Sequence, residues 1–200
     1  MFNHEENPKA RYFNGEVYSN YLVVVAHCVL NQATRWFWNN ESGAWTEGFI
    51  SDFLEKLKMM KVGLYQLPCP EFSLLGNPRR PMTRDEYEVL PGFVDHCRTL
   101  AKNTLRDLKA FKELSTKPKI VILAIIGIEG SPSCGVEFTS RKITNTSVRL
   151  TGRGIFMEIL EELMSIEGMN IPFFGLDGRR LTESISNISH LLEKRIKELV

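Results

Sequence analysis

The sequence predicts a single α/β domain spanning residues 1–200, in which helices cover both faces of a mainly parallel, Rossmann-like, doubly wound sheet. Short apolar runs that favour strands occur at 21–26, 62–67, 120–126 and 171–175. Longer segments with helical spacing of apolar residues separate them. Strands that are apolar throughout and alternate with helices are typical of a parallel sheet buried on both faces. Two hundred residues are enough for one substantial core.

The helical segments follow from apolar residues at steps of three and four, which place these residues on one helix face. Such stripes cover 49–60, 91–111, 155–166 and 181–199. Thr83 followed by Glu86 is typical of a capping box, and Pro91 interrupts this segment, which predicts a short turn of helix before the main one. Residues 1–20 form an N-terminal extension for which the sequence predicts no particular structure.

Composition indicates a cytoplasmic protein without a general affinity for nucleic acid. The formal net charge is +1, so a strong attraction to polyanions is not expected. The apolar stretches are far shorter than the ~20 residues of a membrane helix. The polar N-terminus lacks the apolar region of a secretory signal. Because thiols stay reduced in the cytoplasm, the 4 cysteines do not indicate a disulfide framework.

Three cysteines directly follow predicted strands. Cys28 comes after the first run, Cys69 after the second, and Cys134 after the third and a short loop. Ligands of open parallel sheets bind at the carboxyl ends of the strands, so these cysteines are expected to converge at one edge. Prolines on both sides of Cys69, and small residues around Cys134, indicate tight loops that can direct backbone N–H groups at cluster sulfides or an anion.

The ligand count favours an iron–sulfur cluster held by three cysteines. Structural zinc normally takes four protein ligands, often in CxxC spacing, which is absent here. A 4Fe–4S cluster held by three cysteines keeps one iron with an open position. Cys97 lies on an apolar helical stripe and is predicted to be a core residue. His27 is the alternative fourth ligand, but it adjoins Cys28, and the two side chains at a strand terminus are expected to point apart; a packed or substrate-facing His27 is favoured.

At these residues the sequence resembles the 2-thiouracil desulfidase family. The shared features are Cys28 after the opening strand, Cys69-Pro70-Glu71 followed by Pro78-Arg79, the loop 131–135 with the sequence Ser-Pro-Ser-Cys-Gly, and the Gly-x-Gly of 152–154. The match covers roughly 21–176. The resemblance implies a 4Fe–4S cluster on Cys28, Cys69 and Cys134, and non-redox removal of sulfur from a thiolated pyrimidine.

The chain departs from the family pattern in segments that are expected to border the pocket. Val29-Leu30-Asn31 stands where the family has Leu-Leu-Gly, and 34–38 replaces an Arg-Tyr-Asp-Gly segment. The stretch 72–76 lacks the usual paired glycines. The resemblance therefore carries the cluster over better than the substrate.

Two residues are the predicted catalytic groups. Glu71, two residues past Cys69, is the candidate acid or base, or else a carboxylate that only binds a backbone N–H or Arg79. Ser131, together with Ser133, is expected to hydrogen-bond the substrate or water, or only to stabilise the turn.

Other residues near the motifs have two interpretations each. Arg35, Arg79 and Arg80 bind an anionic substrate or remain solvated. The aromatic residues of 36–38 stack on a base or only pack. The Gly-x-Gly of 152–154 at a helix start is a weak indication of an anion site.

The first hypothesis is an iron–sulfur-dependent enzyme, a hydrolytic desulfidase acting on a thiolated base, nucleoside or similar small molecule. The second is a non-catalytic iron–sulfur or sulfide-carrying protein, and the third is a metal-free nucleotide-binding module. The near-neutral charge favours a small-molecule substrate over transfer RNA. The oligomeric state is not predicted.

Overall fold

Four parallel strands form the central sheet of the computed structural model, which describes residues 20–46, 48–144 and 146–199. The strands are β1 (Tyr21–Val25), β4 (Gly63–Gln66), β5 (Val121–Ile128) and β8 (Phe173–Leu176). They lie in the order β4-β1-β5-β8, and each neighbouring pair is parallel. The central strands β1 and β5 are almost entirely buried, as their unbroken apolar sequences predict.

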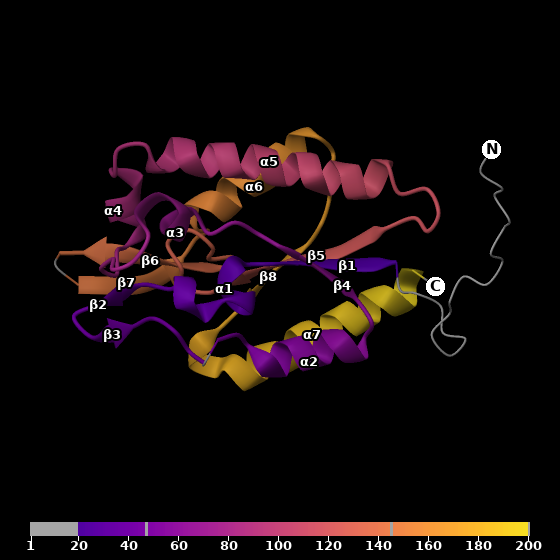
Figure 1. The fold of residues 1–200 in the computed structure, drawn as a ribbon, viewed down its shortest axis with the longest axis horizontal. Helices are drawn as coiled ribbons and strands as arrows, with labels where there is room; N and C mark the ends of the chain where they lie inside the picture. Colours follow the sequence, from indigo (N-terminus) through magenta and orange to yellow (C-terminus); the bar gives the residue numbers. More distant parts are fainter. Residues whose placement is uncertain (1–19, 47, 145, 200) are drawn as a thin grey trace, which may run out of the picture.

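Helices cover both faces of this sheet (Figure 1). The helices α2 (Ser51–Met59) and α7 (Leu181–Leu199) pack together on one face. The helices α5 (Phe93–Glu113) and α6 (Ile155–Ile166) pack together on the other. Within the described residues, no helix has the length and apolar character needed to cross a bilayer.

The strand order confirms the doubly wound architecture. Along the chain the four parallel strands are β1, β4, β5 and β8, so the chain first moves to one edge of the sheet and then returns past β1 to the other. The direction reverses between β1 and β5, which is where open α/β sheets form their ligand crevice. The predicted extension 1–20 lies outside the described residues except for Asn20.

Several short elements surround this crevice. They are α1 (His27–Leu30), α3 (Pro70–Leu75), α4 (Arg84–Glu88), the hairpin β2–β3 (Phe37–Trp38 and Glu41–Ser42) and the hairpin β6–β7 (Phe138–Ile143 and Thr146–Thr151). The capping box of Thr83 and Glu86 is confirmed at the start of α4, and α4 is the short helix predicted before α5. The sequence analysis did not predict either hairpin.

Candidate functional site

The loops after β1 and β4 each place a cysteine at the sheet edge. Cys28 lies in α1, which begins two residues after β1 ends. Cys69 is the N-cap of α3, where its Sγ accepts the Phe72 N–H at 3.4 Å. Pro70 occupies the first position of this helix, which fits proline because that position has no intrahelical N–H bond to lose.

The loop after β5 folds back onto its own strand. The Ile128 N–H donates to the Cys134 carbonyl at 2.9 Å. Gly127 makes this possible, because a Cβ there would lie 2.4 Å from the same carbonyl oxygen. The Ser131 hydroxyl oxygen accepts the Cys134 N–H at 3.0 Å and so closes the turn.

The N-terminus of α6 holds this loop from the other side. The N–H groups of Gly154 and Ile155 donate to Gly135 and Pro132 at 2.9 Å, and the Phe156 N–H donates to Ser133 at 3.1 Å. The prediction of an anion site at 152–154 is therefore wrong. These N–H groups bind backbone carbonyls of the cysteine loop instead.

Cys28, Cys69 and Cys134, here called the cysteine triad, line one cavity of about 700 Å³. The predicted convergence at one sheet edge is thus observed. Cys97 is fully buried in α5 within the hydrophobic core, as predicted. All four thiols are free.

Burial keeps the triad thiols protonated in the absence of a ligand. Burial, together with the neighbouring Glu71 carboxylate, raises the pKa of Cys69 to about 12. Burial also raises the pKa of Cys134, and the nearby Cys69 and Cys28 add to this increase. Burial raises the pKa of Cys28 as well, while Arg35 opposes this shift. Three thiolates this close therefore require positive charge between them.

The donor set fits a cluster better than a single ion. Among the described residues, no group of three His, Cys, Asp or Glu side chains is arranged to hold one metal ion. In an iron–sulfur cluster each cysteine binds a different iron, so the sulfurs surround a volume rather than meet at a point. Three soft thiols from three separate loops, one on a buried residue and two on partly buried ones, match that requirement.

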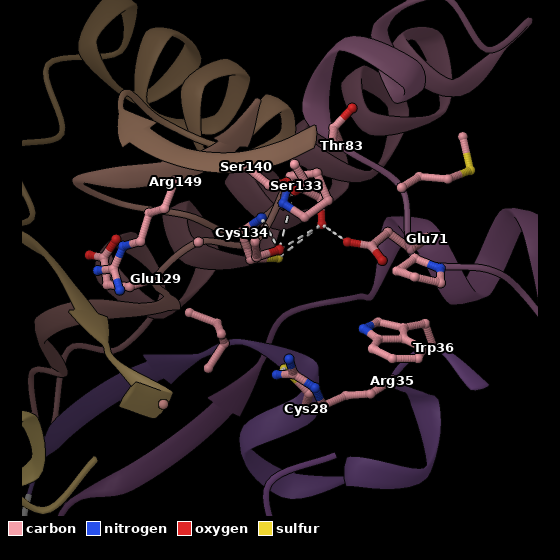
Figure 2. Close-up of a pocket in the computed structure, with 18 of the residues that line it drawn as sticks. Cys28, Arg35, Trp36, Glu71, Thr83, Glu129, Ser133, Cys134, Ser140 and Arg149 are labelled. Carbon is pink, nitrogen blue, oxygen red and sulfur yellow. Dashed lines mark hydrogen bonds between the residues drawn. The ribbon is translucent and has the colours of Figure 1, made fainter. Parts of the chain in front are cut away.

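Glu71 is a carboxylate of the cavity wall whose charge acts on all three triad thiols, and both of its oxygens are hydrogen-bonded. Its Oε1 accepts the Ser133 hydroxyl at 2.6 Å (Figure 2). Its Oε2 accepts Arg79 Nη2 at 3.2 Å and the Tyr87 hydroxyl at 3.3 Å. The side chains of Arg79 and Glu71 are only 6% and 12% exposed, so this is a buried ion pair.

Arg79 is thus not solvated: protein groups bind both of its terminal nitrogens, and its unpaired Nε is buried. Its Nη1 also donates to the Thr34 carbonyl at 2.9 Å and to Asn77 Oδ1 at 3.0 Å. Arg80 lines the cavity but is half exposed and pairs with Glu86 at 2.9 Å. The pairing of Glu71 with Arg79, one of the predicted alternatives, is therefore observed.

A second wall of the cavity carries Arg35, Trp36 and Trp45. The guanidinium of Arg35 lies 4.3 Å above the Trp45 ring, and its Nη1 lies 4.0 Å from Cys28 Sγ. Figure 2 shows Arg35 and Trp36 projecting from the side opposite Ser133 and Cys134. Phe37 and Trp38 are exposed in β2 and do not line this cavity, so of the aromatic run only Trp36 does.

The far end of the cavity is polar. Arg149 in β7 pairs with Asp177 at 2.8 Å, and the Glu129 carboxylate accepts the Phe138 N–H at 2.8 Å. Ser140 in β6 also lines this end, and its hydroxyl oxygen is buried without a hydrogen-bond partner. The cavity therefore extends well beyond the cysteine triad.

Ser131 and His27, two further predicted residues, both line the cavity. The Ser131 hydroxyl lines the cavity but also stabilises the turn, so both of its predicted roles are compatible with its position. His27 lines the cavity and its Nδ1 lies 2.5 Å from Gln66 Nε2, while burial lowers its pKa. The sequence analysis missed Tyr87 and Trp45. No sequence pattern around either residue indicates a place in the site.

Comparisons with known proteins point to one family. The model of a family described as "Putative 2-thiouracil desulfurase" matches residues 20–162. Uncharacterized protein MJ0003 of Methanocaldococcus jannaschii is 28% identical over 176 residues, covering 88% of this chain and 97% of the relative. The solved structure of the 4Fe-4S-dependent thiouracil desulfidase TudS is similar with a TM-score of 0.51 at 23% identity, covering 85% of this chain and 99% of that one. This structural likeness establishes a shared fold.

Proposed function

Because the chain belongs to the 2-thiouracil desulfurase family, we propose that it removes sulfur from a thiolated pyrimidine base or nucleoside. The observation that carries the proposal is the meeting of the cysteine triad and a fixed carboxylate, Glu71, around one cavity. The net reaction replaces a thiocarbonyl by a carbonyl: the substrate and water give the oxo product and hydrogen sulfide. No atom changes its oxidation state.

The cysteine triad would hold a 4Fe–4S cluster, which is the cofactor named for the similar structure TudS. With three protein ligands, such a cluster supplies an iron with an open position, a soft Lewis acid that binds a thiocarbonyl sulfur. A cluster assembled on free thiols requires a compartment that keeps thiols reduced, which supports a cytoplasmic location.

Glu71 is the proposed base. Arg79 and Tyr87 hold Oε2, whereas Oε1 accepts the hydroxyl of Ser133, which lines the cavity. Oε1 is thus the oxygen that receives a proton from the attacking water, either directly or through the Ser133 hydroxyl. Ser131, also on the cavity wall, is placed to hydrogen-bond the water or the product oxygen.

Trp36 supplies apolar surface for a planar ring, whereas Arg35 covers one face of Trp45. Aromatic side chains bind bases by stacking, and they also exclude bulk water from the reacting carbon. The cavity of about 700 Å³ would also hold the cluster, but it extends beyond the cysteine triad to a polar end. A nucleoside is therefore also accommodated, with its sugar toward the polar end near Arg149.

A non-catalytic sulfide carrier is the second candidate, and one observation favours it. Glu71 is held in a buried ion pair with Arg79, and a carboxylate held in this way can be a purely structural group. Both candidates predict a bound cluster, but only the enzyme releases sulfide catalytically.

The test is turnover by the full chain after anaerobic reconstitution with iron and sulfide. We expect 2-thiouracil to yield uracil and sulfide in equal amounts over many turnovers, with the Cys134→Ser variant inactive. A protein that loads the cluster, binds sulfide and shows no turnover with thiolated bases or nucleosides would support the carrier. A protein that takes up no iron would exclude both.

A further inference from the structure

We propose that the guanidinium of Arg35 offsets negative charge at Cys28 and thereby raises the reduction potential of a cluster held by the cysteine triad. The inference rests on the proposed function, because it concerns the cluster that these cysteines would hold. A site with this charge favours the more negative states of its cofactor and attracts an anionic ligand such as sulfide.

Two sulfurs of the cysteine triad lie beside neutral polar groups. The Phe72 N–H donates to Cys69 Sγ at 3.4 Å. The Ser133 hydroxyl lies 3.6 Å from Cys134 Sγ, but its one hydrogen is directed to Glu71 Oε1 at 2.6 Å. Hydrogen bonds to the sulfurs and the net charge of the cluster help to set its reduction potential. These two groups supply no positive charge.

The third sulfur faces a full positive charge. Arg35 Nη1 lies 4.0 Å from Cys28 Sγ, and Figure 2 shows the two side chains together on one side of the cavity. This distance is long for a hydrogen bond, but Coulomb attraction falls off only as the inverse of the distance. A guanidinium does not lose its proton in proteins, so the charge is permanent.

The other charges near the triad do not supply what Arg35 supplies. The Glu71 carboxylate acts on all three sulfurs and disfavours thiolates there. Arg79 acts on Cys69, but its charge is compensated by the ion pair with Glu71. Within the described residues, no carboxylate pairs with the Arg35 guanidinium. An anionic cluster would therefore draw compensating charge from Arg35.

A closed ring of contacts holds this charge in place. Gln32 is 2% exposed, its Nε2 donates to the Cys28 carbonyl, and its Oε1 accepts the Trp45 backbone N–H at 3.0 Å. The Arg35 guanidinium stacks on the Trp45 ring at 4.3 Å and so returns to Cys28 Sγ. The Arg35 carbonyl also accepts Asn77 Nδ2 at 2.9 Å. A charge that is fixed beforehand acts more strongly than a mobile one, because nothing has to reorder when the cofactor binds.

The experiment measures the midpoint potential of the bound cluster in a redox titration of the full chain, reconstituted anaerobically with iron and sulfide. The proposed reaction does not reduce the cluster, so the potential serves only as a measure of the charge that the site supplies. We expect Arg35→Gln to lower the equilibrium constant for one-electron reduction about 10- to 100-fold, because a full charge beside one sulfur is lost. Since a tenfold change is about 59 mV for one electron, the midpoint should become more negative by about 60–120 mV.

Two further variants separate charge from packing. Arg35→Lys keeps the charge but not the flat guanidinium, and its midpoint should lie closer to that of the wild type than to that of Arg35→Gln. Arg106→Gln makes the same change at an exposed arginine of α5 and should keep the wild-type midpoint. Protein without a bound cluster gives no signal, so partial misfolding lowers the amplitude of the titration and leaves the midpoint unchanged.

Three results would overturn the inference. The first is a midpoint of Arg35→Gln within about 18 mV of the wild type, which is about a twofold change. The second is the same shifted midpoint in Arg35→Lys and Arg35→Gln, because packing would then explain the shift. The third is loss of the cluster from both variants, whereas loss from Arg35→Gln with retention in Arg35→Lys would support the role of the charge.

Turnover separates this inference from the proposed function. Turnover of 2-thiouracil by the wild type, together with an unchanged midpoint in Arg35→Gln, would leave the function intact and refute the role of Arg35. A cluster-loaded wild type without turnover on thiolated bases or nucleosides, together with the expected shift in Arg35→Gln, would support the role of Arg35 and refute the proposed reaction. A wild type that takes up no iron would refute both.

Discussion

The buried ion pair between Glu71 and Arg79 allows the structural and chemical roles of Glu71 to be measured separately. Glu71→Gln removes a negative charge 3.2 Å from Arg79 Nη2, where both side chains are nearly inaccessible. Loss of one partner of such a pair costs about 3–5 kcal/mol. Glutamine keeps one acceptor oxygen, and Arg79 keeps Thr34 and Asn77, so we expect the lower value of about 3 kcal/mol. In a chain of this size the Tm should fall by about 6–12 °C.

Turnover should fall by about 10²–10⁴-fold if Oε1 takes the proton of water. Assays well below the Tm of the variant keep this loss apart from unfolding. In a double-mutant cycle with Arg79→Gln, the coupling free energy should be about 1–3 kcal/mol. Glu55→Gln, the same change on the exposed side of α2, should alter stability by less than about 0.5 kcal/mol.

Two results would refute this reasoning. A Tm within 2 °C (roughly 1 kcal/mol) of the wild type, with negligible coupling, would show that the ion pair does not stabilise the site. Near-normal turnover in a cluster-loaded Glu71→Gln protein would exclude Glu71 as the base and leave Ser131, Ser133 or His27.

Three further predictions concern the cysteine loops. Replacing any member of the cysteine triad by serine should reduce iron content and the absorbance near roughly 400 nm, whereas Cys97→Ala should retain both; alanine is used because a serine hydroxyl would be buried without a partner. Burial raises the pKa of Cys69 to about 12, so iodoacetamide should alkylate Cys69 in the iron-free protein about 100-fold or more slowly at pH 8 than it alkylates an exposed cysteine. The alkylation rate should keep rising up to about pH 10. A plateau of the rate near about pH 9 would contradict the raised pKa. Gly154→Ala places a Cβ 2.3 Å from the Ser133 backbone and should cost about 1–3 kcal/mol and lower iron uptake, whereas Gly63→Ala, whose nearest neighbour is at 3.5 Å, should bind iron normally.

The sequence predicts the sheet and the place of the triad because both depend on local patterns. Apolar runs mark the strands, and a cysteine just past a parallel strand has only one edge to occupy. The helix predicted at 155–166 begins and ends at the residues observed for α6. Cys97 lies on a helical stripe, and a stripe in a covered helix is buried.

The contacts that organise the pocket are not local, and the sequence does not predict them. Glu71 and Ser133, which form a hydrogen bond, are 62 positions apart in the chain. Arg35 stacks on Trp45, and the segment between these two residues has no apolar periodicity. The Gly-x-Gly of 152–154 has the expected place at a helix start, but its ligand is the cysteine loop rather than an anion. A pattern identifies the available N–H groups, whereas only the fold determines what they bind.

The two halves of the cavity are built by different parts of the chain, and this separates cofactor binding from substrate choice. The cysteine triad is held by elements of the core: the ends of β1 and β5, the N-cap of α3 and the N-terminus of α6. Trp36 belongs to the excursion around the β2–β3 hairpin, whose strands are exposed and pair with each other rather than with the central sheet. Loops on a rigid scaffold tolerate change better than the scaffold itself. Since the departures from the family pattern at 34–38 fall within this excursion, the ring that the protein accepts can differ from that of its relatives while the site for the cluster stays the same.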